Sequence, residues 1–229
     1  MDAVIGAGGP TGLECVKRLA QLGRPVQAII RSPDKYTDLF SGLGSNVTAV
    51  KGDVESSESL TVALAGVKNI IFAASGKGYW SARAVDELGV GAVAEAAKAV
   101  GVKHIVLVSS ALVSPHNRCH PIRLILNNIR WGLMDSKYRG ENLLRKSGIT
   151  YTVVRPGGLT NGPALTEELV VNQGDRVAGR VSRADVAAVA VAALSDPRAA
   201  NVTLELSSKS GAVPPANQLS SLFKGLAKD

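Results

Sequence analysis

Aromatic residues are scarce in this chain, at 4% of 229 residues, whereas small aliphatic residues and glycine are abundant. This balance is typical of buried parallel strands covered by closely packed helices. No run of apolar residues approaches the ~18 that a bilayer span requires, so we expect no transmembrane segment. No signal peptide is visible, and the first expected strand begins at Asp2. We therefore expect any targeting segment to lie outside this sequence.

Cysteine is also scarce. Cys15 and Cys119 lie far apart, so no disulfide framework is expected, and Cys15 is expected to be a buried residue of the first helix. His116, Cys119 and His120 lack a fourth ligand at a suitable spacing, so we expect no metal site.

The formal charge is +7, but the chain has no Lys/Arg run and no aromatic residues interleaved with basic ones. A nucleic-acid partner is therefore not expected. The charge indicates a solvated basic surface together with a site for phosphate.

Short β-branched runs alternate with helical stretches from end to end. The expected strands are 2–5, 26–30, 47–51, 69–73, 104–108, 151–154 and 202–206, and the expected helices are 10–22, 81–100, 134–147, 184–194 and 218–226. Near-continuous apolar strands between helices predict an α/β protein. We expect one domain over residues 1–229, built on a doubly wound parallel β-sheet with helices on both faces.

Residues 113–132 break this alternation. The segment is basic and partly amphipathic, and it carries Arg118, Arg123, Arg130 and Trp131 beside five leucines and isoleucines. Because it follows a parallel strand, it should overhang the crevice where ligands bind. Two interpretations remain open: a packed helical excursion, or a substrate lid or docking surface for a membrane or a partner.

The turn after the first strand reads IGAGGPTG, with a G-x-x-G-x-x-G spacing. Glycines there let the backbone turn sharply and approach a pyrophosphate, toward which the following helix points its free N–H groups. The context of a strand before and a helix after indicates a Rossmann-type nucleotide site. The expected cofactor contacts are Gly6, Gly8, Gly9, Pro10, Thr11 and Gly12.

The end of the second strand distinguishes the two nicotinamide cofactors. Proteins that bind NAD usually carry an acidic residue at this place, whereas this chain has Arg31, followed by Ser32 and Lys35. A guanidinium complements a 2′-phosphate. The sequence therefore predicts NADP(H).

Two more loops fit the same ligand. Asp53 and Val54 follow the third strand, where a carboxylate can accept from the adenine amino group; alternatively, Asp53 caps the next helix. Ala73, Ala74 and Ser75 follow the fourth strand, and their small side chains leave room for ribose and pyrophosphate.

The chain resembles the atypical short-chain dehydrogenase/reductase family across nearly its whole length. The resemblance runs through the blocks GAGGPTG, AIIRSPDK, KGDV, VDELGVGAVAEAAKAVGVKHIVLVSS, SKYRGENLLRKSGITYTVVRPGGLT and VSRADVAAVAVAAL. It implies a Rossmann fold that binds NAD(P). The later blocks are similar to a plant and cyanobacterial subgroup that resembles flavin reductase/biliverdin reductase B and the redox component of plastid protein import. The implied location is the chloroplast, and otherwise the cytoplasm.

The resemblance also implies site residues. Ser109 or Ser110 matches the family's active-site serine, and Lys137, which opens K-x-x-x-E with Glu141, matches the lysine that contacts the nicotinamide ribose. The RPGGL motif implies that Pro156, Gly157 and Gly158 lie beside the nicotinamide ring.

One departure concerns the chemistry. Typical members use Tyr-x-x-x-Lys, in which the phenol acts as acid or base. Leu133 stands four residues before Lys137, and Tyr138 is adjacent but points about 100° away around the helix. Carbonyl–alcohol interconversion by the usual tyrosine mechanism is therefore not expected.

Two functions fit these observations. The first is an NADPH-dependent reductase that transfers hydride to a small-molecule flavin, quinone or tetrapyrrole-like acceptor. The alternative is a non-catalytic NADP(H)-binding redox sensor or assembly factor, in which the cofactor shifts a conformational equilibrium that a protein partner recognises. A nucleotide-sugar epimerase is disfavoured, because only about 70 residues follow the RPGG motif and they must also complete the sheet.

Overall fold

The computed structural model describes residues 1–76, 79–129, 132–176 and 179–229. Lys77 and Gly78, in the loop after the fourth strand, lie outside the described residues, as do Arg130 and Trp131 of the basic segment.

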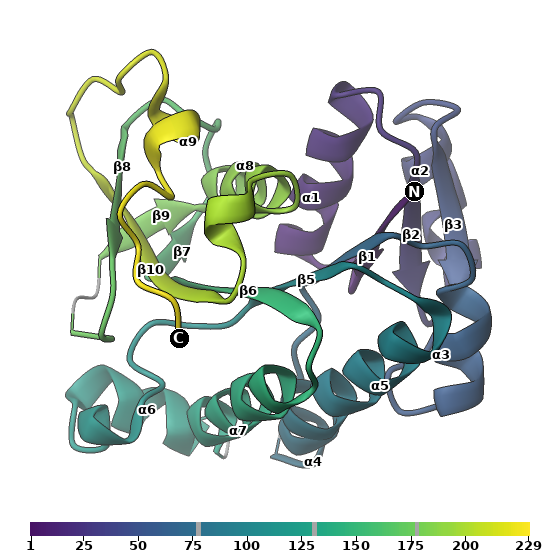
Figure 1. Ribbon diagram of the computed structural model, residues 1–229, viewed down its shortest axis with the longest axis horizontal. Helices are drawn as coiled ribbons and strands as arrows, with labels where there is room; N and C mark the ends of the chain where they lie inside the picture. The colour runs from purple at the N-terminus through teal and green to yellow at the C-terminus, as the bar shows by residue number, and fades with distance from the viewer. Residues whose placement is uncertain (77–78, 130–131, 177–178) are drawn as a thin grey trace.

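The described strands join one mostly parallel sheet in the order β3-β2-β1-β4-β5-β6-β10-β9-β7, with β8 paired to β10 (Figure 1). The strands are β1 (Asp2–Ile5), β2 (Val26–Ile30), β3 (Val47–Lys51), β4 (Asn69–Phe72), β5 (His104–Val108), β6 (Thr150–Pro156), β7 (Gly158–Thr160), β8 (Glu168–Asn172), β9 (Arg180–Ser182) and β10 (Val202–Lys209). From β1 the chain adds β2 and β3 on one side, and it then crosses over to add β4 on the other side of β1. The strand order therefore reverses between β1 and β4. Ligands of such sheets bind beyond the carboxyl ends of the strands at this point.

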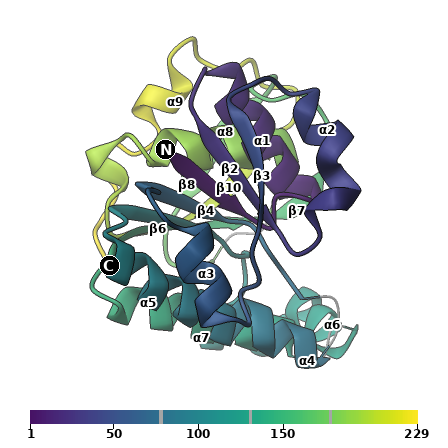
Figure 2. The same cartoon turned by 90° about the vertical axis from the view of Figure 1, so that its right-hand side faces the viewer.

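Helices cover both faces of the sheet, α1 and α8 on one and α3, α5 and α7 on the other (Figures 1 and 2). The helices are α1 (Pro10–Gln21), α2 (Thr37–Ser41), α3 (Ser57–Ala63), α4 (Tyr79–Ala82), α5 (Val90–Val100), α6 (Pro121–Ile129), α7 (Leu133–Lys146), α8 (Arg183–Ala193) and α9 (Gln218–Ser221), with a π-helical stretch at Arg83–Gly89. Each face has its own apolar core. The expected doubly wound Rossmann-type fold is confirmed.

The local sequence explains the central elements. Every residue of β1 and β5 is buried, as expected for strands covered on both sides. Cys15 is completely buried in α1, as expected, and burial raises the pKa of its thiol to about 12.

The expectation of a wholly parallel sheet is wrong at one edge. β10 extends to Lys209, three residues beyond its expected end, and β8 and β9 pair with it in antiparallel orientation. The segment between β6 and α8 contains many turn residues and is too short for repeated helical crossovers, so it folds back as short strands instead.

Two helices also differ from expectation. The helix expected over 81–100 contains the π-helical stretch Arg83–Gly89, and the terminal helix ends at Ser221 rather than Leu226. The chain adopts a positive φ of 78° at Gly225, which is incompatible with a continuing helix.

His104, at the start of β5, is a buried polar residue of the sheet. The Thr152 hydroxyl donates to the carbonyl of Ala199 at 2.7 Å, so its oxygen accepts from Nε2 of His104 at 2.9 Å. Burial lowers the pKa of His104 to about 4, partly offset by the carbonyl of Tyr151. The imidazole is therefore neutral in the folded protein at neutral pH.

This pKa predicts an acid-dependent loss of stability. Below pH 6.5 the unfolded chain takes up a proton at His104 that the folded protein binds only near pH 4, so the free energy of unfolding falls as the pH is lowered. We expect His104 to account for about 2 kcal/mol of the loss between pH 7 and pH 5. In urea denaturation, His104→Gln should lose less stability over this interval than the wild type. His120→Gln, a substitution of a partly exposed histidine, should lose as much as the wild type; equal losses in all three proteins would contradict this assignment.

Candidate functional site

A cleft of about 360 Å³ opens at the carboxyl ends of β1, β2, β3 and β4. It brings together most of the residues that the sequence assigned to the cofactor. Its lining includes Gly6, Gly8, Gly9, Arg31, Ser32, Asp53, Val54, Ala73, Ala74 and Ser75. Lys35 and Tyr36 also line it, and Tyr36 is a residue that the sequence reasoning missed.

The glycines of the first turn are required by close backbone contacts. Gly6 has a φ of +79°, and a Cβ there would lie 2.6 Å from the backbone of Ala74. A Cβ on Gly12 would lie 2.2 Å from the carbonyl oxygen of Gly6, and one on Gly8 would meet the ring of Tyr36. Pro10, Thr11 and Gly12 form the first turn of α1 and do not line the cleft itself.

The start of α1 is suited to an anion. Gly9 occupies the N-cap without a side-chain hydrogen bond, and the first turn contains no acidic residue. The first N–H groups of the helix and its dipole are therefore available to a phosphate.

The end of β2 is basic. Arg31 and Lys35 line the cleft and, within the described parts of the chain, neither forms an ion pair with a carboxylate. By contrast, Arg24 pairs with Asp2 and Arg155 pairs with Glu141. The positive charge beside the cleft is thus not held in an ion pair among the described residues, and it is complementary to a phosphate monoester.

Asp53 does not cap the following helix. Ser56 is the N-cap of α3 and accepts from the amide of Ser59, whereas Oδ1 of Asp53 accepts from the amide of Glu55 at 3.1 Å. The capping alternative is therefore wrong, and the carboxylate stays at the cleft, where its contact with adenine is a prediction.

A narrow second pocket adjoins the cleft through their shared residue Ala74. Ser109 and Lys137 both line it. The Oγ of Ser109 is buried and has no hydrogen-bond partner among the described residues. Because a buried hydroxyl normally finds a partner, this atom indicates a place where a ligand completes the site.

Lys137 is held by Asp86, a residue that the sequence reasoning missed. Nζ of Lys137 lies 2.8 Å from Oδ1 of Asp86, and the amide of Gly76 donates to Oδ2 at 2.8 Å. Asp86 belongs to the π-helical stretch, an irregularity that is frequent at functional sites. Gly140 lets α7 pack closely against the π-helical stretch, since a Cβ there would lie 2.0 Å from the carbonyl oxygen of Asp86.

Leu133 is buried at the start of α7, and Tyr138 packs against the small apolar cluster of Ala111, Leu112, Val113 and Met134. Neither residue lines the pocket of Ser109 and Lys137.

Pro156, Gly157 and Gly158 connect β6 to β7 at the same edge of the sheet, outside the lining of the cleft. The amide of Gly157 donates to Leu206 and that of Gly158 to Gly179. Their contact with a nicotinamide ring remains a prediction.

A glycine turn opening a helix, a basic strand end and a serine–lysine pocket, all at the carboxyl edge of a parallel sheet, define a dinucleotide-binding protein of the Rossmann type. The chain belongs to the NAD(P)H-binding family, whose model matches residues 6–197. The glycine cradle, the uncompensated arginine and the unpartnered Ser109 hydroxyl fit this cofactor.

Relatives extend over most of the chain. An uncharacterized chloroplastic protein of Arabidopsis thaliana is 33% identical over 199 residues, which are 83% of this chain and 70% of that protein. The uncharacterized sugar epimerase YhfK of Bacillus subtilis is 30% identical and covers 96% of this chain and 98% of its own. Among solved structures, ChuY, an anaerobillin reductase of Escherichia coli O157:H7, is 26% identical with a TM-score of 0.77, over 94% of this chain and 99% of that one. Within the described residues, no helix is long and apolar enough to cross a membrane.

The two glycines after Pro156 should respond differently to alanine. A Cβ on Gly157 would lie 2.3 Å from the carbonyl oxygen of Gly179, whereas one on Gly158 would lie 3.6 Å from the same atom, an ordinary contact. We expect Gly157→Ala to lower the free energy of unfolding by about 1–3 kcal/mol, because the backbone at Gly179, just before β9, must shift. Gly158→Ala should change it by less than about 0.5 kcal/mol in the same urea titration. Equal destabilisation would contradict the strand arrangement at this edge.

Proposed function

We propose that the protein is an NADPH-dependent reductase whose acceptor is a flavin, a quinone or a tetrapyrrole-like molecule. One observation carries the proposal: a serine hydroxyl with no partner among the described residues and a carboxylate-paired lysine adjoin the cofactor cleft, and the described lining of their pocket contains no tyrosine. That combination suits hydride transfer to an acceptor that needs no phenol to protonate it.

The described residues suggest how the cofactor is held. The first turn of α1 would bind the pyrophosphate, Arg31, Ser32 and Lys35 the 2′-phosphate, and Asp53 the adenine amino group. Ser109 and Lys137 would contact the nicotinamide ribose. When bound, NADPH supplies the hydride.

Lys137 has a different task here from the lysine of a tyrosine-dependent enzyme. Its charge is matched by Asp86 at 2.8 Å, and an ammonium has three donors, so hydrogen bonds to ribose hydroxyls remain available. Since no tyrosine is among the described residues that line this pocket, the lysine positions the cofactor and does not lower a tyrosine pKa.

The lack of a tyrosine in the described lining of this pocket narrows the chemical class of the acceptor. A flavin, quinone or tetrapyrrole spreads negative charge over a conjugated system, so solvent or the Ser109 hydroxyl can deliver the proton. An epimerase is not favoured, because the residues after Gly158 complete the sheet through β7 to β10. The chloroplastic relatives support a plastid location.

Arg31 provides the test of cofactor choice. We expect Arg31→Ala to weaken NADPH binding at least ~10-fold, because a charge-assisted hydrogen bond to phosphate is lost, and to leave NADH binding within about twofold. Calorimetric titration measures both. Arg118→Ala, which removes an exposed arginine outside the cleft, should change neither; equal losses for NADPH and NADH in Arg31→Ala would exclude a 2′-phosphate contact.

Ser109 provides the test of turnover. Its hydroxyl makes no hydrogen bond among the described residues, so Ser109→Ala should leave the unfolding free energy within about 0.5 kcal/mol of wild type. We expect it to lower kcat/KM for NADPH oxidation about fivefold or more with FMN, menadione or biliverdin as acceptor. Ser110→Ala is the matched control, because within the described residues that hydroxyl donates a hydrogen bond to the adjacent carbonyl of Ala111 alone. No NADPH oxidation by wild type with any of the three acceptors would refute the reductase.

A second candidate function is that of a non-catalytic NADP(H)-binding protein, whose cofactor-dependent conformation a protein partner recognises. It is favoured by α6, which exposes Ile122, Ile125 and Ile129. Selective NADPH binding without oxidation of any acceptor in the same assay would support it.

A further inference from the structure

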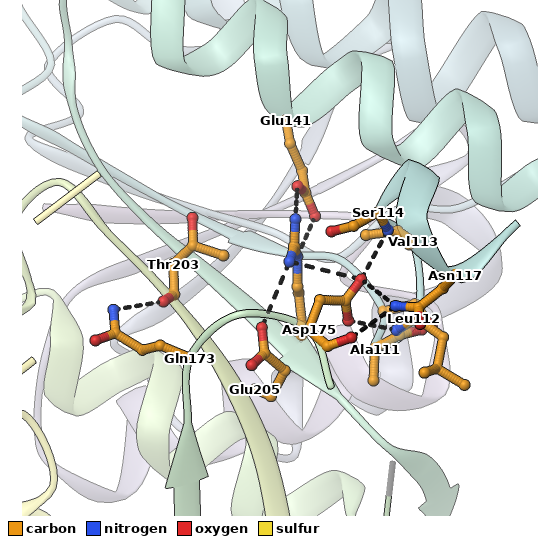
Figure 3. A network of polar contacts seen from close by, with 12 residues as sticks. Ala111, Leu112, Val113, Ser114, Asn117, Glu141, Gln173, Asp175, Thr203 and Glu205 are labelled. Atoms are coloured by element: carbon orange, nitrogen blue, oxygen red, sulfur yellow. Dashed lines mark hydrogen bonds and ion pairs between the residues drawn. The ribbon is translucent and has the colours of Figure 1, made fainter. Parts of the chain in front are cut away.

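The backbone of Leu112–Ser114 is held from both sides by buried charges. The amides of Leu112 and Ser114 donate to the two carboxylate oxygens of Asp175 at 2.6 and 2.7 Å (Figure 3). The carbonyls of Leu112, Val113 and Ser114 accept from Nη1 of Arg123. Asp175 and Arg123 are both buried. One short segment thus has both its donors and its acceptors tied to charged side chains.

This segment follows Ser109 and Ala111, close to the residues that the sequence assigned to the nicotinamide end of the cofactor. It begins three residues after Ser109, and the amide of Ala111 donates to the carbonyl of Pro156 at 2.9 Å. It therefore follows directly on the contact between the chain after β5 and the end of β6.

We call the contacts of Asp175 and Arg123 with the Leu112–Ser114 backbone the clamp. The clamp holds backbone conformations that are otherwise unfavourable. Leu112 has a φ of +66° and Asp175 a φ of +55°, and the two residues are hydrogen-bonded to each other. A leucine in the left-handed region is uncommon for steric reasons, and such residues persist only where their surroundings enforce them. They cluster at functional sites.

The two charges are themselves anchored. Nη1 of Arg155 lies 3.7 Å from Asp175, and Arg155 also pairs with Glu141 at 2.6 Å. Burial alone would raise the pKa of Asp175, but hydrogen bonds from Ser114 and Leu112 and the charge of Arg155 hold it below its usual value. Nη2 of Arg123 pairs with Asp135 at 2.5 Å. The carboxylate is therefore ionised at neutral pH and both partners are fixed in place.

The clamp also explains why α6 turns a charged residue toward the protein interior. In α6, Arg123 points inward and is 4% exposed, whereas Ile125 and Ile129 are 56% and 70% exposed. This is the reverse of an ordinary amphipathic helix. The arginine faces inward because it binds the carbonyls of the clamped segment.

We propose that Asp175 and Arg123 are positioning residues that fix the Leu112–Ser114 backbone, and that this segment is the rigid wall of the acceptor subsite. The second part rests on the proposed reductase function. A wall of fixed backbone would orient a planar acceptor over the cofactor without contributing a group that reacts.

The test compares Asp175→Asn with Asp196→Asn, a substitution of another carboxylate that accepts a backbone amide, on the turn before β10. Amide hydrogen exchange would be followed by NMR, together with NADPH affinity by calorimetry. We expect exchange of the Leu112 and Ser114 amides to accelerate at least ~10-fold in Asp175→Asn only, with the NADPH Kd within about twofold of wild type. With the acceptor that wild type uses among FMN, menadione and biliverdin, the acceptor KM should rise at least ~5-fold, and more than kcat falls.

Unchanged exchange at Leu112 and Ser114 would overturn the clamp. Exchange accelerated throughout the protein, with NADPH binding lost in parallel, would indicate a purely structural role. Should Asp175→Asn fail to fold, Arg123→Lys, which retains the charge but not the forked geometry, takes its place. Local acceleration with an unchanged acceptor KM would overturn the wall, and absence of wild-type turnover would refute the reductase while the exchange data still judge the clamp.

Discussion

The cofactor cleft depends on one constraint, the close backbone contact between the turn after β1 and the end of β4. Gly6 and Ala74 approach so closely that no Cβ fits between them, and Gly12 stacks on the carbonyl of Gly6 in the same way. This contact sets where α1 begins and therefore where its free N–H groups point. It also leaves the ends of β2 and β3 open beside the turn, which gives Arg31 and Asp53 access to the same cleft. The motif glycines would be required for packing even without a ligand, so the uncompensated charge beside them is the stronger sign of function.

The part of the sheet edge around Ser109 and Lys137 depends on a different kind of interaction. It relies on buried charges rather than on glycine contacts: Lys137 pairs with Asp86, and Asp175 pairs with Arg155. Figure 3 shows Asp175 beside the Leu112 and Ser114 backbone. Buried ion pairs contribute little net stability, because desolvation offsets their attraction, but the loss of one partner is costly. Such networks are therefore better suited to fixing positions than to stabilising the fold. Where the resemblance leads one to expect a tyrosine the chain has Leu133, so this position supplies no phenol.

Much of the central sheet could be predicted from the sequence. The bounds of β1, β2, β3 and β5 agree with expectation because short β-branched runs bounded by turn residues are a local signal. The antiparallel β8 and β9 could not be predicted, since they are short, partly polar and defined only by their pairing with β10. The residues that the resemblance identified, Ser109 and Lys137, do share a pocket. Asp86 and Asp175 escaped notice because their partners lie about 50 to 60 residues away in sequence, as with Lys137 and Leu112, and only the assembled sheet brings them together.

The central claim is that the basic end of β2 binds the 2′-phosphate of NADP(H), and phosphorus NMR of bound NADP+ tests it most directly. The 2′-phosphate has its own resonance, separate from the pyrophosphate, and a second pKa near 6 in solution. If Arg31 binds it, the guanidinium favours the dianion, so the resonance should shift on binding and its pKa should fall by about one unit. A pyrophosphate signal that changes while the 2′-phosphate titrates as in free solution would show that this group projects into solvent, and would contradict the account.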